Sequence, residues 1–293
     1  MSTAAEVARF NMIEQQMRPW EVLDTQVLAV INEIDRQNFV PEQYRGLAYA
    51  DCRIPLSSQV SMLPPTIEGR MLQSLLVSDD DKILLIGSGY GYLGACLARL
   101  GEQVLSIDTD TDIQQQARNN TDAREITNIE YEQANALASE YDQAFDVIAV
   151  TGSVHSVPVN LEQALKVGGR MFIVAGRSPA MQALLITRVD DNEWTRQSLF
   201  ETDIPALADQ QLHILLGLWP LLKPGGTLLY ATCSVLDEEN SQVVQRFLTA
   251  QGAGAELCPT EVTWGEPVAC GRQLLPTPEG PDGLFYALLR KTG

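Results

Sequence analysis

The chain has 293 residues, which is enough for one large α/β domain or for a domain with a substantial appendage. Hydrophobic residues make up 45% of it and charged residues 20%, as in an ordinary globular protein. No apolar run approaches the roughly 18 residues of a membrane helix. The N-terminus lacks the basic start and apolar stretch of a signal peptide, so we expect a cytoplasmic protein without a membrane partner.

The formal charge of −18 bears on the possible partners. Residues 1–206 carry a net charge of −14 and residues 207–293 a net charge of −4, so neither part is basic. Proteins that bind nucleic acid usually present a basic stripe to the phosphates, and we therefore expect no nucleic-acid partner. The oligomeric state is not indicated by the sequence.

Cysteine and histidine are too few and too scattered to predict a metal site. The five cysteines are odd in number and never form a CxxC pair, which argues against a disulfide framework and against zinc. His155 and His213 are the only histidines, and an isolated histidine is more often structural than catalytic.

Residues 1–78 are predicted to be mainly helical. A first helix covers Ala4–Gln16 and ends at Arg18-Pro19-Trp20. Asp24 can cap a second helix that runs to about Asp35. Pro64-Pro65 opens a third helix to about Val77, because proline is tolerated in the first turn of a helix.

Residues 79–206 alternate between strand and helix patterns. Such alternation specifies a mostly parallel sheet with helices on both faces. Two further strand-like runs follow without a helix between them and suit an antiparallel edge hairpin. We therefore predict a seven-stranded Rossmann-like α/β core. Its strands are Lys82–Ile86, Gln103–Asp108, Ile129–Glu132, Phe145–Thr151, Arg170–Ala175, Ala183–Val189 and Trp194–Phe200.

Residues 207–293 begin with a sequence pattern that also occurs in residues 161–175. Both Leu161–Ala175 and Leu215–Ala231 contain an apolar helix, a lysine, a Gly-Gly turn and a strand. A single sheet of this type normally contains that unit once. We expect an α/β appendage of helix, strand and helix, which either packs on the edge of the sheet or displaces its edge hairpin.

A glycine loop follows the strand Lys82–Ile86 directly. Gly87-Ser88-Gly89-Tyr90-Gly91 lets the backbone turn sharply and lets a ligand approach the main chain, and the next helix points its N–H groups at that ligand. Asp108 ends the following strand, where a carboxylate can accept hydrogen bonds from ribose hydroxyls. Together these features predict a nucleotide-type site.

Two cofactors compete for this site. Residues 89–94 also satisfy the dinucleotide pattern GxGxxG, with Asp108 close to the expected acidic position. That interpretation leaves Gly87-Ser88 between the strand and the motif, whereas GxGxG directly after a strand favours S-adenosylmethionine. We therefore expect S-adenosylmethionine, with a nicotinamide cofactor or an empty glycine turn as alternatives.

Residues 1 to about 206 resemble the protein-L-isoaspartate O-methyltransferase family. Four stretches carry the resemblance, and they read NMIEQQMRPWEVLD (11–24), ADCRIP (50–55), ILLIGSGYGYLGACLA (83–98) and FDVIAVTGSVHSVP (145–158). It implies that Gly87, Ser88, Gly89 and Gly91 wrap the methionine part of the cofactor. It also implies that Asp108 holds the ribose, that Asn135 lies near the adenine, and that Thr151 ends the fourth strand at the substrate mouth.

The sequence departs from that family in places that concern the substrate. Family members usually have an acid two residues before the first glycine of the loop, and Leu85 stands there. The family's Gln-Thr-Ile-Ser segment corresponds to Gln59-Val60-Ser61-Met62, so apolar side chains replace two hydroxyls. These departures argue against isoaspartate repair and leave cofactor binding intact.

Residues from about 207 to 293 resemble the C-terminal end of the 16S rRNA cytosine-C5 methyltransferases. LLKPGGTLLYATCSVLDEEN (221–240) and GRQLLP (271–276) carry the resemblance, and TDIPAL (202–207) resembles both families. It implies that Cys233 is a nucleophile toward the pyrimidine ring, a role that also needs a second cysteine and an acid on preceding strands. Those are missing here, so an inherited cysteine at a strand end is the favoured interpretation.

Three functions are thus open. The first is an S-adenosylmethionine-dependent methyltransferase acting on a small-molecule or protein carboxyl acceptor. The second is an rRNA cytosine methyltransferase that uses Cys233, which the acidic charge disfavours. The third is a non-catalytic binding protein that keeps the cofactor fold. The chain reads as a fusion of one complete methyltransferase domain with the tail of another.

Overall fold

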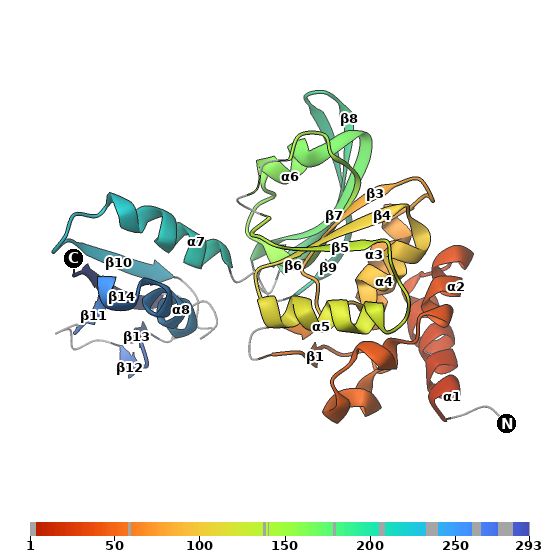
Figure 1. Ribbon diagram of the computed structural model, residues 1–293, viewed down its shortest axis with the longest axis horizontal. Coiled ribbons are helices and arrows are strands. Elements are labelled where there is room, and N and C mark those ends of the chain that lie inside the picture. The colour runs from red at the N-terminus through yellow and green to blue at the C-terminus, as the bar shows by residue number, and fades with distance from the viewer. Residues whose placement is uncertain are drawn as a thin grey trace. The chain divides into compact units, whose positions relative to one another are not determined.

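The computed structural model places residues 4–57, 60–136, 139, 141–177, 180–204, 209–232, 240–259, 265–274 and 284–292. The chain divides into two compact units, Met1–Ala206 (unit 1) and Leu207–Gly293 (unit 2) (Figure 1). Among the placed residues, no helix is long and apolar enough to cross a bilayer.

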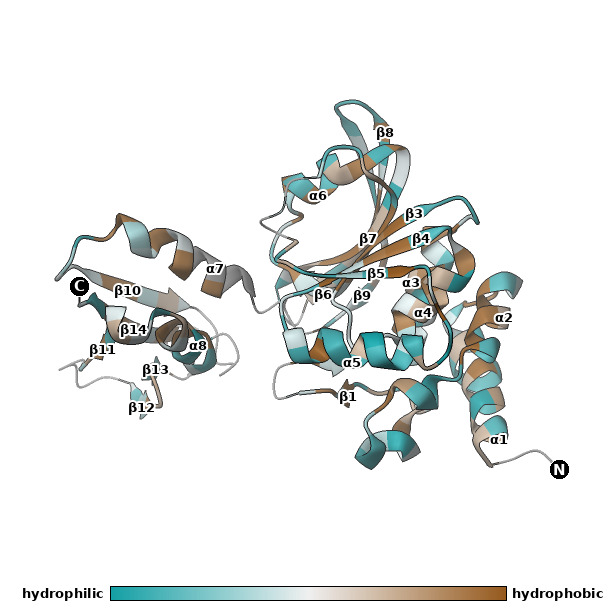
Figure 2. Ribbon diagram, in the orientation of Figure 1, coloured by the Kyte–Doolittle hydropathy of each residue, from teal (hydrophilic) through white to brown (hydrophobic). Residues whose placement is uncertain are grey.

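The core of unit 1 is a seven-stranded sheet in the order β5-β4-β3-β6-β7-β8-β9. Its first five strands are parallel, whereas β8 and β9 form the predicted antiparallel hairpin at one edge. Apolar residues concentrate on its central strands (Figure 2). The predicted class and strand number are therefore confirmed. The strands are β3 (Lys82–Ile86), β4 (Gln103–Asp108), β5 (Ile129–Gln133), β6 (Phe145–Val154), β7 (Leu165–Arg177), β8 (Ala180–Asp190) and β9 (Glu193–Thr202).

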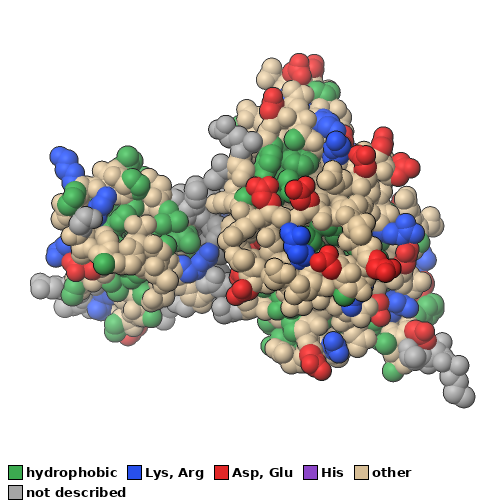
Figure 3. Space-filling model, viewed as in Figure 1, with side chains coloured by type: hydrophobic (Ala, Val, Ile, Leu, Met, Phe, Trp, Pro, Cys, Tyr) green, Lys and Arg blue, Asp and Glu red, His purple; other side chains and the backbone are tan. Residues whose placement is uncertain are grey.

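Helices connect the parallel strands and pack against them. Helices α4 (Tyr92–Leu100) and α5 (Thr111–Asp122) contact β4 and β5, and α6 (Val159–Ala164) leads into β7. Asp110 caps α5 by accepting hydrogen bonds from the N–H groups of Asp112 and Ile113. On the face of unit 1 drawn in Figure 3, acidic and basic side chains are interspersed.

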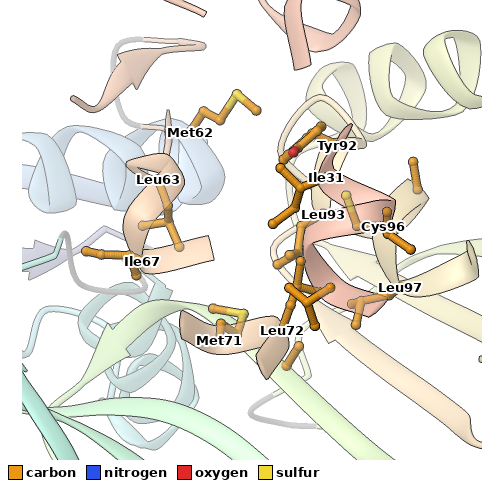
Figure 4. Close-up of a cluster of buried hydrophobic side chains, with 14 of the residues drawn as sticks. Ile31, Met62, Leu63, Ile67, Met71, Leu72, Tyr92, Leu93, Cys96 and Leu97 are labelled. Atoms are coloured by element: carbon orange, nitrogen blue, oxygen red, sulfur yellow. The ribbon is translucent and has the colours of Figure 1, made fainter. Parts of the chain in front are cut away.

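The N-terminal segment forms a cap on this core. It contains α1 (Ala4–Asn11), α2 (Thr25–Glu33), α3 (Pro65–Leu75) and the hairpin of β1 (Ile54–Pro55) with β2 (Ser61–Met62). It also contains the short π-helix η1 (Met12–Met17) and the 3-10 helices η2 (Arg18–Trp20), η3 (Arg36–Phe39) and η4 (Glu42–Leu47). Asp24 caps α2 as predicted, accepting from the N–H groups of Gln26 and Val27. Side chains of α3 lie across from those of α2 and α4 in the apolar core (Figure 4).

A buried ion pair ties this cap together. Arg36 Nε donates to Glu68 Oε2 at 3.1 Å, and its other nitrogens donate to the carbonyls of Ala48 and Leu63. The guanidinium also lies 5.5 Å from the ring centroid of Tyr92, the first residue of α4. Burial raises the pKa of Glu68 to about 7, against the opposing effect of Arg36. The pair thus joins three cap segments to the helix behind the glycine loop.

Five of the seven strands differ from their predicted bounds, and the differences in β6 and β7 bear on the site. Strand β6 continues past Thr151 to Val154, with a register shift against β7 between Ala149 and Ser153. Strand β7 begins at Leu165 rather than at Arg170, because Gly168-Gly169 form an irregularity within the strand instead of a turn before it. Gly168 has a φ of +85°, a conformation that glycine adopts without strain.

Unit 2 is an α/β unit that contains the predicted helix, strand and helix as α7, β10 and α8, and it contains more sheet than predicted. Its sheet has the order β10-β14-β13-β12, with β11 also paired to β14. The two Gly-Gly strands, β7 and β10, lie in different sheets, so the edge hairpin of unit 1 is not displaced. The elements are α7 (Asp209–Leu218), η5 (Trp219–Leu221), β10 (Thr227–Thr232), α8 (Ser241–Gln251), η7 (Gly252–Gly254), β11 (Ala255–Cys258), β12 (Glu266–Val268), β13 (Gly271–Leu274) and β14 (Leu284–Lys291).

Candidate cofactor site

The glycine loop lies where the chain order of the sheet reverses. From β3 the chain passes through α4 to β4 on one side, whereas β6 occupies the other side of β3. Open α/β sheets bind ligands in the crevice at the carboxyl ends of the strands at such a point. The loop of residues 87–91 is therefore at the position where a cofactor site is expected.

Three loop glycines adopt backbone conformations that other residues rarely adopt. The φ angles of Gly87, Gly89 and Gly91 are +90°, +49° and +95°. A Cβ atom on Gly87 would overlap the hydroxyl of Thr151, and one on Gly91 would lie 3.0 Å from the carbonyl oxygen of Ala117. A Cβ on Gly89 would meet only Leu56, at 3.5 Å. Packing thus explains the first and third glycines, and the backbone at Gly89 is open to a ligand.

Asp108 connects the end of β4 to this loop. Its Oδ2 accepts a hydrogen bond from the N–H of Ser88 at 2.7 Å, and its Oδ1 accepts from the N–H of Asp110 at 3.0 Å. Burial raises the pKa of Asp108, and these two N–H groups oppose the rise. Each carboxylate oxygen can accept a second hydrogen bond, so Asp108 can fix the loop and still hold ribose hydroxyls.

Asn135 follows β5 at the same edge of the sheet. The N–H of the preceding Ala134 donates to the carbonyl of Asp108 at 3.2 Å, which brings the ends of β4 and β5 together. The carbonyl of Asn135 accepts from the N–H and the hydroxyl of Ser139. Its side chain is half-buried, next to the strand end that carries Asp108.

Thr151 occupies a different place from the predicted one. It lies within β6 and not at the end of that strand. Its hydroxyl donates to the carbonyls of Ile86 and Gly87, at 3.1 and 3.2 Å. The side chain therefore braces the first turn of the glycine loop, whereas its place at the substrate mouth stays a prediction.

The cap supplies contacts that the sequence patterns did not predict. Tyr90 Oη donates to the carbonyl of Leu56 at 3.2 Å, so the segment between β1 and β2 adjoins the loop. Asn120 Nδ2 donates to the carbonyl of Tyr90 at 2.9 Å and holds the loop from α5. Met62 is 6% exposed in the core, and Leu85 is fully buried within β3. Neither position offers a polar group to a ligand.

Cys233 lies outside the described residues, as does Gln59. The residues flanking Cys233 carry a buried amide network. Asn240 accepts a hydrogen bond from the hydroxyl of Thr232 and donates to Gln273 Oε1 at 2.8 Å. The described strands of unit 2 all pair antiparallel, and no glycine loop follows a parallel strand among them, which distinguishes this network from the candidate cofactor site of unit 1.

The residues present fit an adenosyl cofactor. The backbone of Gly89 is open to a ligand, the carboxylate of Asp108 lies at the end of β4, and the amide of Asn135 follows β5. Gly87, Ser88, Gly89, Gly91, Asp108 and Asn135 thus lie at one edge of the sheet, while Thr151 supports them from β6. Among the described residues no cluster of His, Cys, Asp or Glu side chains is arranged to hold a metal ion.

Comparisons with known proteins match two families to overlapping parts of the chain. The family model described as protein-L-isoaspartate(D-aspartate) O-methyltransferase matches residues 8–210. A second model, described as 16S rRNA methyltransferase RsmB/F, matches residues 177–290. The two matches overlap around the predicted joint, and they confirm the two resemblances found in the sequence.

Similar proteins cover most of unit 1. A protein-L-isoaspartate O-methyltransferase 2 of Marinobacter nauticus is 33% identical over 205 residues, covering 69% of this chain and 94% of that protein. A protein-L-isoaspartate O-methyltransferase of Koribacter versatilis is 33% identical over 210 residues, covering 71% and 94%. A crystal structure of a Plasmodium falciparum family member with S-adenosyl-L-homocysteine has a TM-score of 0.60 at 18% identity, covering 70% and 99%, and supports the fold. The chain therefore belongs to the protein-L-isoaspartate(D-aspartate) O-methyltransferase family and is an S-adenosylmethionine-dependent methyltransferase.

Proposed function

We propose that unit 1 binds S-adenosylmethionine over residues 87–91 and methylates a carboxylate of a small-molecule or protein acceptor. The observation that carries the proposal is the open backbone of Gly89 beside a loop that Asp108 holds by its N–H groups. Asp108 would hold the ribose and Asn135 would lie beside the adenine.

The chemistry asks little of the protein beyond orientation. When bound, S-adenosylmethionine supplies a methyl group on a positively charged sulfur. A carboxylate acceptor brings its own nucleophilic oxygen and negative charge, so no general base is required. The chain must place that oxygen about 3–3.5 Å from the methyl carbon and exclude water. The absence of a predicted catalytic histidine or cysteine at this site is consistent with that demand.

The acceptor is proposed to differ from an ordinary isoaspartyl peptide. Val60 is half-buried against the core and Met62 is buried within it, so the segment that corresponds to the family's Gln-Thr-Ile-Ser presents no hydroxyl at these two positions. A carboxylate that relied on such hydroxyls would lose their hydrogen bonds, each worth about 1 kcal/mol or more. We expect low activity toward isoaspartyl peptides for this reason.

Calorimetric titration of the full chain with S-adenosylmethionine and, separately, with NAD tests the proposal. We expect binding of the former, weakened by about 1–3 kcal/mol in Asp108→Ala because a charged acceptor for ribose hydroxyls is removed. The exposed Asp79, which precedes β3 at the opposite end of that strand, provides the matched control Asp79→Ala with unchanged affinity. Binding of NAD alone, or equal affinity in both variants, would overturn the proposal.

A further inference from the structure

Two basic side chains lie beyond the carboxyl ends of neighbouring strands in unit 1. His155 follows the last residue of β6, and Arg177 is the last residue of β7. These strands are parallel neighbours, with Val154 opposite Ala175. Because β6 also adjoins β3, the two side chains are at the same edge of the sheet as the glycine loop. At that edge they can contact an acceptor that reaches the proposed cofactor site.

The two side chains are in contact. Arg177 Nε donates to His155 Nδ1 at 3.3 Å, and Arg177 Nη2 lies 3.4 Å from His155 Nε2. Just before them, the buried hydroxyl of Ser153 donates to the carbonyl of Ile204 at 2.9 Å and anchors the end of β6. The register shift between Ala149 and Ser153 lies in the same stretch, and such bulges often re-aim side chains beside active sites.

Arg177 differs from the arginines that serve the fold. Arg36, Arg170 and Arg196 donate to carboxylates of Glu68, Asp81 and Glu162 within unit 1. In the described part of the chain Arg177 forms no ion pair with a carboxylate, and its side chain is exposed. A guanidinium has five N–H donors, and the contacts with His155 use two of its nitrogens. Donors therefore remain for a ligand.

A protein with a large negative charge needs a positively charged group such as the Arg177 guanidinium to bind an anionic acceptor. Unit 1 carries a net charge of −14, which repels a carboxylate that approaches the site. A guanidinium recognises a carboxylate by two parallel hydrogen bonds, and the reacting carboxylate loses its charge on methylation. A separate, unreacting carboxylate is the better partner for a fixed arginine, because it remains charged in acceptor and product alike.

We infer that Arg177, held by His155, binds a second carboxylate of the methyl acceptor, which is therefore a compound with at least two carboxylates. The inference rests on the proposed function, because it takes residues 87–91 as the methyl-donor site. Arg177 contributes to specificity for the methyl acceptor and is not required for binding of the methyl donor. The second carboxylate could belong to a free dicarboxylic acid or to an acidic peptide, and in both cases the guanidinium of Arg177 would bind a carboxylate.

The test uses the imidazole of His155 as a reporter in the full chain. With only two histidines in the sequence, histidine labelled with ¹³C at Cε1 gives two resonances, and His155→Gln assigns them. S-adenosyl-L-homocysteine is kept saturating. Three probes are titrated: glutarate, the peptide acetyl-Gly-Glu-Gly-Glu-Gly-amide, and its analogue with Gln in place of both Glu.

We expect a saturable shift of the His155 resonance with glutarate or with the acidic peptide, and the responding probe identifies the source of the carboxylate. Arg177→Gln should weaken that binding at least tenfold and leave the affinity for S-adenosyl-L-homocysteine unchanged. Lys82→Gln, which removes one positive charge at the amino end of β3, should change neither.

No shift with either acidic probe, or an equal shift with the Gln peptide, would overturn the inference. Equal weakening in Arg177→Gln and Lys82→Gln would also overturn it, because general charge would then explain the effect. Failure to bind S-adenosyl-L-homocysteine would instead contradict the proposed function, so the two failures are distinguishable.

Discussion

The sequence pattern that Leu161–Ala175 shares with Leu215–Ala231 has different structural surroundings in the two units. In both, a Gly-Gly pair follows a lysine, and its first glycine has a positive φ, +85° at Gly168 and +75° at Gly225. A Cβ on the second glycine would lie 2.9 Å from the Lys166 carbonyl in unit 1 and 2.8 Å from the Lys223 carbonyl in unit 2. The backbone at the two glycine pairs is therefore similar, although Gly168-Gly169 lie within β7 and Gly225-Gly226 precede β10.

The strands that follow differ in burial. In unit 1, β7 lies between β6 and β8, and Phe172 is fully buried. In unit 2, β10 pairs only with β14 among the described strands, and Leu229 is 60% exposed. Local sequence thus determines the backbone conformation of the glycine pair and the strand that it adjoins, whereas the neighbouring strands determine which side chains are buried. In the described residues of unit 2 no glycine loop follows a parallel strand, in contrast to residues 82–91 of unit 1.

The largest expected effect on stability concerns the buried ion pair Arg36–Glu68 of unit 1. Glu68→Leu removes the acceptor of Arg36 Nε and leaves a buried guanidinium that cannot lose its proton, so we expect unit 1 to lose about 3–5 kcal/mol of unfolding free energy. The double variant Arg36→Met/Glu68→Leu should recover most of this loss. Urea unfolding followed by hydrogen exchange of residues 82–108 measures it, and an equal loss in the double variant would contradict the account.

The same carboxyl predicts a pH dependence confined to unit 1. Burial raises the pKa of Glu68 from its ordinary value of 4.5 to about 7, so the folded state binds more protons than the unfolded state between these values. The contribution of this group to stability is full below pH 4.5 and is lost as the pH rises through 7. Glu68→Gln, which keeps an acceptor for Arg36, should remove this slope. A slope unchanged in that variant would assign it to other groups.

A smaller effect is expected for the amide network of unit 2. Asn240 is 1% exposed and connects Thr232 to Gln273. Asn240→Ala removes both hydrogen bonds and should cost about 1–3 kcal/mol. Hydrogen exchange along a urea titration should show the loss in residues 227–259 and leave residues 82–108 unchanged. A loss shared equally by both units would mean that they do not unfold independently.

The smallest effect concerns the support of the glycine loop. Thr151→Val keeps the shape of the side chain and removes the hydroxyl that donates to Ile86 and Gly87, so we expect a loss of about 1 kcal/mol in stability. Affinity for S-adenosylmethionine should fall modestly, by calorimetry. If Thr151 instead faced the acceptor, stability and cofactor affinity would stay unchanged while methyl transfer fell.

Regular hydrophobic patterns predicted the sheet of unit 1 closely. The bounds of β3 and β4 coincide with the predicted ones, because each strand is a buried apolar run that a glycine or an acid ends. The role of Thr151 was not predictable, since β6 continues past it and the partners of its hydroxyl come from β3. The contacts of Arg36, Leu56 and Arg177 join segments far apart in sequence, and one sequence contains no signal for them. The strands of unit 2 were underestimated because β11–β13 are three or four residues long.

The most direct test of the central claim asks which unit binds the methyl donor. Hydrogen exchange of the full chain is compared with and without S-adenosylmethionine. We predict protection in residues 83–92, 106–110 and 134–136, and none in residues 209–293, because a glycine loop with an acid at the next strand end is found in unit 1 and not among the described residues of unit 2. Protection confined to residues 227–259, or none anywhere at saturating cofactor, would contradict the assignment of the cofactor site to unit 1.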